Sequence, residues 1–295
     1  MEKSPPSLYD GAIANPAAIA SVRITGASRA RVTAGMTNPF HVRLMNRLSL
    51  LFVGLLSMAC VPALAGTLTV AVAANVQYAF DELQTEFRKE SGHDLKPVYA
   101  SSGKLTAQIM NGAPFDVFLS ADMDYPEKLH HEGHATAAPK VYAYGTLVLW
   151  TLKDLDLAKW QRVLAGPAVT RIAVANPKTA PYGRETMKAL TYFKLDTALK
   201  DKMVFGESIS QTNQYIQSRT ADAGFTAKSV VVSPEMKGQG KWIELPKESY
   251  QPIAQGIVVL KHGAKTNAAV AQQFQDFMLS TKSRTILERH GYLLP

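Results

Sequence analysis

The chain has 295 residues, of which 46% are hydrophobic and 19% are charged. These proportions exclude a disordered chain, and the length fits one large domain or two smaller ones. A membrane-embedded bundle is also excluded, because the only long apolar run lies near the N-terminus. Lys and Arg number 32 against 24 Asp and Glu, which gives a formal net charge of +8.

Residues 45–65 are predicted to form a signal peptide. Arg47 supplies a positive charge, and the apolar run at 48–61 is about 14 residues long, too short to span a bilayer. The segment ends in Pro-Ala-Leu-Ala, and we expect cleavage before Gly66. Residues 1–44 would then be an upstream extension that is disordered or not translated, with a genuine long leader as the alternative. The sequence therefore predicts export to the periplasm.

The only cysteine, Cys60, lies within the predicted signal peptide. A lipid-attachment cysteine normally follows a leucine three positions earlier, where this chain has Ser57, so lipidation is not favoured. Cleavage before Gly66 leaves no disulfide, and the core must hold the fold alone. Residues 1–65 contain six of the basic and two of the acidic residues, so the remainder carries a net charge of only +4. Nucleic-acid binding is not expected.

Strand and helix patterns alternate from residue 67 onward. Leu68, Val70 and Val72 show the period of two of a strand, and the apolar spacing from Val76 to Phe87 predicts a helix with Asn75 as its N-cap. The elements expected after this helix are strands at 95–99 and 116–119 and helices opening at 101–103 and covering 125–131.

The apolar stretch at 141–152 is unusually long for one strand and is expected to cross between two lobes. The later pattern predicts strands at 171–175, 203–205, 222–225 and 253–260, helices at 181–193 and 210–218, and two C-terminal helices. We therefore expect an α/β protein with a two-lobed fold, each lobe a mainly parallel sheet flanked by helices. Residues 66–144 plus 248–295 would form one lobe and residues 145–247 the other.

Short neutral donors follow several of the predicted strands. Asn75, Ser101-Ser102-Gly103, Pro181-Tyr182-Gly183 and the segment 207–210 all stand at helix starts. Ligands of open parallel sheets bind at this edge, and helix N-termini offer free N–H groups and partial positive charge. Several such starts around one cleft would bind an anion that remains ionised. The alternative is that these residues are ordinary helix caps and packing residues.

Three stretches together resemble the periplasmic molybdate-binding proteins of ABC transporters, a type II solute-binding protein family. They are Val-Ala-Ala-Asn at 72–75, Tyr-Ala-Ser-Ser-Gly-Lys-Leu at 99–105 and Gly-Ala-Pro-Phe-Asp-Val-Phe-Leu-Ser-Ala-Asp at 112–122. An Asn-Pro-x-x-x-Pro-x-Gly pattern follows at 176–183, and the resemblance covers essentially all of residues 66–295. It implies a venus-flytrap fold with tetrahedral molybdate or tungstate in the hinge cleft.

The resemblance also implies which residues hold the anion. Ser102 matches the family's serine after the second strand, and Tyr182 and Ile209 match positions that contribute backbone N–H groups. Many members have a serine after the first strand, where this chain has Ala74 and Asn75. Some members have a tyrosine hydroxyl near the position of Ala227, which this chain lacks. Molybdenum would be present only within the bound oxyanion, without a direct protein ligand, and no cofactor is implied.

We therefore expect a monomeric extracytoplasmic solute-binding protein, not an enzyme. It would capture molybdate, and also tungstate, and deliver it to the ABC transporter permease in the inner membrane. The alternatives are a binder of another tetrahedral oxyanion such as sulfate or thiosulfate, and a sensor that docks on a receptor. A remote alternative is a serine hydrolase using Ser102 and Lys104 of an S-x-x-K motif, but the S-D-N and K-T-G motifs that such enzymes need are missing.

Two further groups of residues could have a function, but each also has a simple structural explanation. The His-His-Glu-Gly-His run at 130–134 contains metal-capable side chains, but its spacing fits a solvated helix end better than a metal site. Lys104, Lys178 and Arg184 are expected near the cleft, where they could attract a dianion over a distance. The alternative for each of the three is a solvated surface position.

Overall fold

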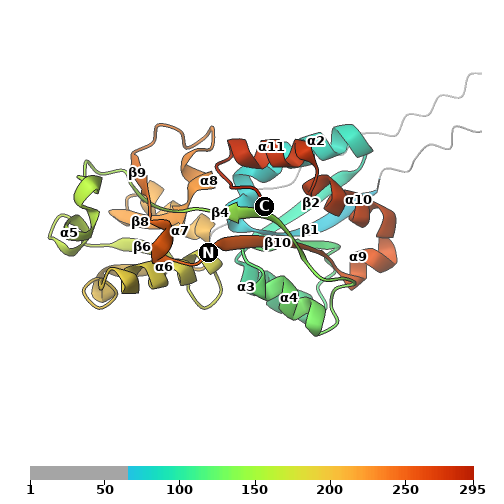
Figure 1. Ribbon diagram of the computed structural model, residues 1–295, viewed down its shortest axis with the longest axis horizontal. Helices are drawn as coiled ribbons and strands as arrows, with labels where there is room; N and C mark the ends of the chain where they lie inside the picture. The colour runs from blue at the N-terminus through green and yellow to red at the C-terminus, as the bar shows by residue number, and fades with distance from the viewer. Residues whose placement is uncertain (1–65) are drawn as a thin grey trace, which may run out of the picture. The chain divides into compact units, whose positions relative to one another are not determined.

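Two five-stranded sheets organise residues 66–295, which are the residues that this computed structural model describes (Figure 1). The predicted signal peptide, its cleavage site, Cys60 and the upstream extension at 1–44 lie outside the described residues. We call the part built on the first sheet lobe I and the part built on the second sheet lobe II. No helix in the described part of the chain is both long and apolar enough to cross a membrane.

Lobe I contains the sheet β2-β1-β3-β10-β4. Strand β1 pairs in parallel with β2 and β3, whereas β10 runs antiparallel to β3 and β4. The strands are β1 (Thr67–Ala73), β2 (Asp94–Ala100), β3 (Val117–Leu119), β4 (Lys140–Gly145) and β10 (Ile253–Val259). The helices are η1 (Ala74–Val76), α2 (Gln77–Ser91), α3 (Ser102–Met110), α4 (Asp124–His131), α9 (Lys261–Thr266), α10 (Ala268–Met278) and α11 (Thr281–Arg289).

Lobe II contains the sheet β7-β6-β8-β5-β9, in which β6 is parallel to β7 and β8, and β5 is antiparallel to β8 and β9. The strands are β5 (Leu147–Thr151), β6 (Ile172–Ala175), β7 (Met203–Gly206), β8 (Ala223–Ala227) and β9 (Lys241–Glu244). The helices are η2 (Leu157–Lys159), α5 (Trp160–Ala165), α6 (Pro181–Tyr192), η3 (Lys200–Lys202), α7 (Ile209–Gln217), α8 (Lys228–Val231) and η4 (Lys247–Ser249).

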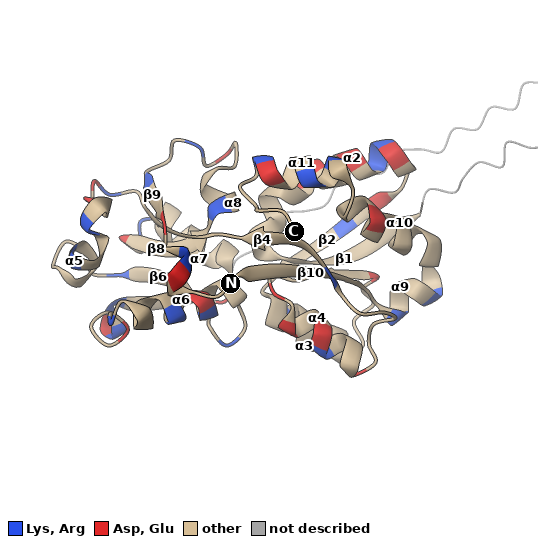
Figure 2. Cartoon of the chain, viewed as in Figure 1, with Lys and Arg blue, Asp and Glu red and all other residues tan. Residues whose placement is uncertain are grey.

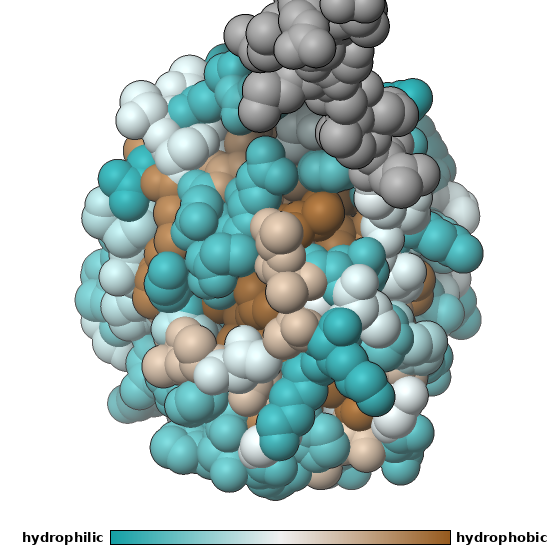
Figure 3. All heavy atoms as spheres, turned by 90° about the vertical axis from the view of Figure 1, so that its right-hand side faces the viewer, coloured by the Kyte–Doolittle hydropathy of each residue, from teal (hydrophilic) through white to brown (hydrophobic). Residues whose placement is uncertain are grey.

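Each lobe has a hydrophobic core between its sheet and its helices. In lobe I the apolar face of α2 places Phe80 and Phe87 against Phe274 of α10, with ring centroids 6.3 and 5.1 Å from Phe274. In lobe II, Trp160 packs edge-on against Phe225 of β8. The outer end of lobe I is largely hydrophilic, with apolar atoms showing between polar ones (Figure 3). Basic and acidic residues follow one another along the ribbons of α2, α6 and α11 (Figure 2).

The predicted long strand at 141–152 is two strands, because the chain leaves one sheet and enters the other at Thr146. Gly145 pairs with Ile253 in lobe I, and Leu147 pairs with Ala227 in lobe II. The α/β class and the two-lobed fold predicted from the sequence are confirmed. The sheets are mixed rather than mainly parallel, since the two strands that follow a crossing, β5 and β10, run antiparallel to their neighbours.

Candidate functional site

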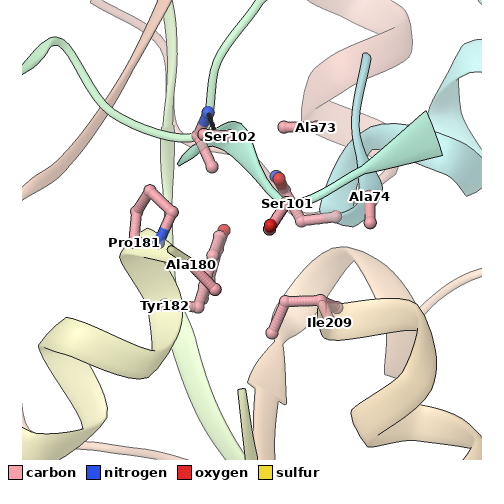
Figure 4. Close-up of a pocket in the computed structure, with 10 residues that line it drawn as sticks. Ala73, Ala74, Ser101, Ser102, Ala180, Pro181, Tyr182 and Ile209 are labelled. Carbon is pink, nitrogen blue, oxygen red and sulfur yellow. Dashed lines mark hydrogen bonds between the residues drawn. The ribbon is translucent and has the colours of Figure 1, made fainter. Parts of the chain in front are cut away.

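A small cavity lies between the two lobes. The space between its lining atoms is about 200 Å³, part of which is open to solvent. The lobe I side is formed by the end of β1 and the start of α3, and the lobe II side by the starts of α6 and α7 (Figure 4). Its lining consists of Ala73, Ala74, Asn75, Ser101, Ser102, Ala121, Ala180, Pro181, Tyr182 and Ile209.

The structure brings all five sequence-predicted site residues to this one cavity. Ala74, Asn75 and Ser102 line it from lobe I, and Tyr182 and Ile209 line it from lobe II. They come from four segments that are far apart in the chain. Ala227 is different: this last residue of β8 is fully buried and does not belong to the lining.

Three helices begin at the cavity. Ser102 is the first residue of α3, Ile209 is the first residue of α7, and Tyr182 is the second residue of α6. The first N–H groups of a helix have no intrahelical acceptor and carry partial positive charge. Pro181 occupies the first position of α6, where a backbone N–H would have no intrahelical acceptor, so the missing N–H of proline costs no hydrogen bond. The backbone thus presents donors from both lobes to the same small space.

The start of α6 lies directly against the end of strand β6. A Cβ atom added to Gly183 would lie 1.9 Å from the carbonyl oxygen of Ala175, so only glycine permits this approach. The close packing fixes the position of the Tyr182 N–H at the cavity, and this explains the glycine of the Pro-Tyr-Gly motif.

The two serines at the start of α3 have different surroundings. Ser102 Oγ accepts a 2.9 Å hydrogen bond from the N–H of Ala121, which orients the hydroxyl and leaves its hydrogen to be donated. Ser101 is the N-cap of α3 but its side chain makes no capping hydrogen bond. Its Oγ atom is buried without a hydrogen-bond partner among the described residues. A buried hydroxyl without a hydrogen-bond partner is unfavourable unless a ligand supplies that partner.

The sequence placed Ser101 among the donors at helix starts, but it assigned only Ser102 of this pair to the anion. The signal was available in the Ser-Ser doublet, since two adjacent hydroxyls at a helix start can both face the same ligand. The lining residues that the sequence did not indicate are Ala73, Ala121 and Ala180, whose apolar side chains shape the cavity without offering a side-chain donor. No polarity pattern could have indicated them.

Asn75 has a different role from the N-cap that the sequence predicts. It lies within η1, and helix α2 starts two residues later at Gln77 without a side-chain cap. Its Nδ2 atom donates to Gln255 Oε1 at 3.0 Å and to Tyr292 Oη at 3.2 Å. Both hydrogens of the Asn75 amide are therefore used inside the protein, and an anion could receive only the backbone N–H of this residue.

None of the ten lining residues carries a charge. Two of the three basic side chains expected near the cleft are paired across it: Lys104 with Glu207 at 3.2 Å, and Arg184 with Asp122 at 2.7 Å. Burial raises the pKa of Asp122, and the hydrogen bonds from Arg184 and Ser120 oppose this shift. With their charges partly neutralised, Lys104 and Arg184 act as contacts between the lobes more than as long-range attractors.

The lobes are in direct contact around the cavity. Gly103 N donates to Thr179 O at 2.9 Å, and Tyr125 Oη donates to Lys178 O at 3.2 Å. On the other side, Ser210 Oγ donates to Gln77 Oε1 at 3.0 Å. These bonds join lobe I to lobe II, so the structure represents a closed arrangement.

The geometry does not provide the pair that a hydrolase would need. Lys104 Nζ points to Glu207 with more than half of its side chain exposed, and Ser102 Oγ is bonded to the N–H of Ala121. Within the described part of the chain no hydrogen bond joins Ser102 to Lys104. A serine nucleophile needs its base within hydrogen-bond reach, so the arrangement fits ligand binding better than catalysis.

Comparison with known proteins agrees with this fold. The family model for bacterial extracellular solute-binding proteins matches residues 68–293, and the chain belongs to this family. Within it, the chain is 38% identical to the molybdate-binding protein ModA of Azotobacter vinelandii over 236 residues, which are 80% of this chain and 92% of that protein. It is 36% identical to ModA of Rhodobacter capsulatus, with 79% and 90% covered.

A solved structure supports the same relationship. The periplasmic molybdate-binding protein of Azotobacter vinelandii superimposes with a TM-score of 0.73 at 36% sequence identity, covering 77% of this chain and 99% of that one. The resemblance seen in the sequence motifs is therefore confirmed over nearly the whole length of these relatives.

Proposed function

We propose that this protein is an extracytoplasmic solute-binding protein that captures molybdate, and also tungstate, and delivers it to an ABC importer. The observation that carries the proposal is an uncharged cavity, lined by both lobes, into which helix starts and the Ser101 hydroxyl, unpartnered among the described residues, bring neutral donors. The relatives named molybdate-binding proteins support the choice of anion.

Neutral donors suit a tetrahedral dianion. Such an anion is fully ionised at neutral pH and offers only acceptors, so N–H and O–H groups can satisfy all of its oxygens. A carboxylate in the lining would repel it, and none is present among the ten lining residues. The starts of α3, α6 and α7 add their partial positive charge from different directions.

Binding is proposed to proceed by closure of the lobes around the anion. In an open form the Ser101–Ser102 side and the Tyr182–Ile209 side are separated, and neither alone surrounds the ligand. The anion stabilises the closed form only because it makes more hydrogen bonds there than in the open one. The closed surface of the two lobes would then dock on the membrane permease.

Export and assembly follow from the same proposal. The segment 45–65 would direct the chain across the inner membrane and be removed near Gly66. The exported protein, residues 66–295 divided into lobes 66–144 plus 248–295 and 145–247, would act as a monomer in the periplasm. It is proposed to be a carrier and not an enzyme.

Thermal unfolding with different anions tests the proposal. The protein is heated alone and with about 1 mM molybdate, tungstate, sulfate or phosphate; sub-micromolar binding raises the free energy of unfolding by about 4 kcal/mol or more. Stabilisation by molybdate and tungstate but not by sulfate or phosphate is expected. Equal stabilisation by sulfate would show that the protein binds tetrahedral oxyanions more broadly. An unfolding temperature unchanged by all four anions would contradict the proposed function.

A further inference from the structure

A buried amide on strand β10 connects the two sides of the cavity. Gln255 is fully buried, and its Oε1 atom accepts hydrogen bonds from Asn75 Nδ2 at 3.0 Å and from Tyr142 Oη at 2.8 Å. Its Nε2 atom donates to Tyr182 Oη at 3.1 Å. Gln255 does not belong to the cavity lining, but two residues that do, Asn75 and Tyr182, are bonded to it.

These two partners belong to different lobes. Asn75 lies in η1 of lobe I, and Tyr182 lies near the start of α6 in lobe II. Tyr182 has two functions at once, since its backbone is at the cavity while its side chain reaches Gln255. Figure 4 shows Tyr182 on the lobe II side of the cavity, opposite Ser101 and Ala74. The amide of Gln255 therefore bridges the lobes directly behind the candidate site.

The bridge lies where the chain crosses between the lobes. Gly145 is the last residue of β4, after which the chain passes from lobe I to lobe II. It pairs with Ile253, the first residue of β10, where the chain has returned to lobe I. A Cβ atom on Gly145 would lie 2.7 Å from Gln255 Nε2 and still closer to Tyr182 Oη. The register of β10 also shifts between Gln255 and Gly256. Backbone and side chains are thus fitted tightly around this contact.

The network depends on the closed arrangement. Burial raises the pKa of Tyr182 well above its ordinary value, so its hydroxyl remains protonated and neutral. If lobe II moves away, the hydrogen bond between Tyr182 Oη and Gln255 Nε2 is broken. The partners in lobe I, Asn75 and Tyr142, can remain bonded to Oε1. We therefore expect the bond to Tyr182 to be made mainly when the lobes are closed.

We propose that Gln255 is a positioning residue that couples lobe closure to the shape of the anion cavity by holding Asn75 and Tyr182 in register across the two lobes. The role in anion affinity rests on the proposed function above, whereas the role in lobe closure does not. Gln255 does not line the cavity and is proposed to act through the residues that do.

Binding measurements on single variants test the first part. Molybdate affinity is measured calorimetrically for the full chain, for Gln255→Leu and for the control Gln275→Leu. The control alters a buried glutamine of α10 whose side chain, among the described residues, bonds only to Gln272. We expect Gln255→Leu to weaken binding about tenfold or more, because it removes one buried hydrogen-bond network. Gln275→Leu should change the affinity less than about twofold. Unchanged affinity of Gln255→Leu, with only a lower melting temperature, would overturn the proposal.

A double-mutant cycle separates positioning from general destabilisation. Tyr182→Phe removes the hydroxyl that Gln255 contacts and keeps the backbone N–H at the cavity. If Gln255 acts through Tyr182, the effects of Gln255→Leu and Tyr182→Phe on affinity are not additive, and the double variant binds about as weakly as the weaker single variant. Additive losses would contradict the proposed coupling.

A distance measurement tests closure without a ligand. Spin labels are placed at the exposed residues Met110 of α3 and Tyr192 of α6, each changed to cysteine, in the full chain with Cys60→Ser. We expect Gln255→Leu to shift the distance distribution of the anion-free protein to longer values, while Gln275→Leu does not. If the unaltered chain binds no oxyanion, the proposed function fails, but the distance measurement still decides whether Gln255 acts in lobe closure. Identical distance distributions for Gln255→Leu and the unaltered chain would overturn that role.

Discussion

Arg184 of lobe II and Asp122 of lobe I form a 2.7 Å ion pair beside the candidate cavity between the lobes, with the Asp122 carboxylate largely buried. A second carboxylate, Asp124, lies 3.1 Å from the same guanidinium. The pair joins the last residue of the Ser-Ala-Asp motif to the residue that follows the Pro-Tyr-Gly motif. Two segments that the sequence singles out for anion binding therefore also hold each other across the cleft.

Replacing Arg184 tests whether it stabilises closure or attracts the anion. The charge of Arg184 is balanced by Asp122 and Asp124, so we expect Arg184→Met to leave the association rate of molybdate nearly unchanged. The dissociation rate should rise several-fold, because the closed form loses a contact worth about 1 kcal/mol. Stopped-flow kinetics at two salt concentrations measures both rates. A large, salt-dependent fall in the association rate would show instead that Arg184 attracts the dianion.

Ser101 should contribute to binding but not to folding. Its hydroxyl is buried and unpartnered in the described structure, so Ser101→Ala removes a group that only a ligand satisfies. We expect a loss of about 1–3 kcal/mol in binding, or roughly tenfold to a hundredfold in Kd, with no fall in the melting temperature of the free protein. Titration calorimetry and thermal unfolding measure the two effects.

The matched control for Ser101 is Ser233→Ala. Ser233 Oγ is likewise buried without a partner, but it follows α8 in lobe II and does not line the cavity. This variant should bind molybdate with unchanged affinity. Equal affinities for Ser101→Ala and the unaltered protein would remove Ser101 from the site.

Gly183→Ala should damage both the site and the fold. The added methyl group would meet the Ala175 carbonyl oxygen, so the start of α6 must move away from β6. Overpacking of this kind costs about 1–3 kcal/mol and would displace the Tyr182 N–H from the cavity. Urea unfolding and molybdate titration should both show a loss. Wild-type affinity in this variant would mean that the start of α6 does not contact the anion.

Asp222 should make the protein less stable in acid. Although burial alone would raise it, the pKa of Asp222 is lowered, because Lys153, Thr170 and Arg171 donate hydrogen bonds to its carboxylate. A carboxyl group whose pKa is lower in the folded state stabilises it above the unfolded value of 3.8, and this contribution is lost as the pH falls further. Asp222→Asn should therefore be less stable than the unaltered protein at pH 7, by about 1–3 kcal/mol.

The difference between the two proteins should become smaller as the pH is lowered through the range below 3.8. Unfolding by denaturant at a series of pH values measures it. A difference that is independent of pH would show that the effect of Asp222→Asn comes from packing and not from the charge of the carboxylate.

The sequence predicted the elements and the cavity residues better than it predicted hydrogen-bond roles. Local patterns were enough for α2, whose apolar spacing is regular, and for Ser102, Tyr182 and Ile209, which stand at helix starts. They were not enough for Asn75, because its partners Gln255 and Tyr292 lie 180 and 217 residues further along the chain. Such contacts depend on how β10 and the C-terminal residues are placed, which periodicity does not encode.

The crossing at Thr146 was visible only in part for a similar reason. The apolar run from 141 to 152 showed that the segment is buried, since strands enclosed on both faces are apolar throughout. Where it changes sheets is decided by its partners, β10 on one side and β8 on the other. The sequence shows Ser101 only as half of a Ser-Ser doublet at a helix start, whereas the lack of a hydrogen-bond partner for its hydroxyl among the described residues is visible only in the coordinates.

The most direct test of the central claim is the crystal structure of the protein grown with molybdate, measured at the molybdenum absorption edge. The account predicts one strong anomalous peak in the cavity between the lobes, with oxygens in hydrogen-bond reach of Ser101 and Ser102 from lobe I and of the Tyr182 and Ile209 N–H groups from lobe II. A peak elsewhere on the protein, or contacts from one lobe alone, would contradict the account.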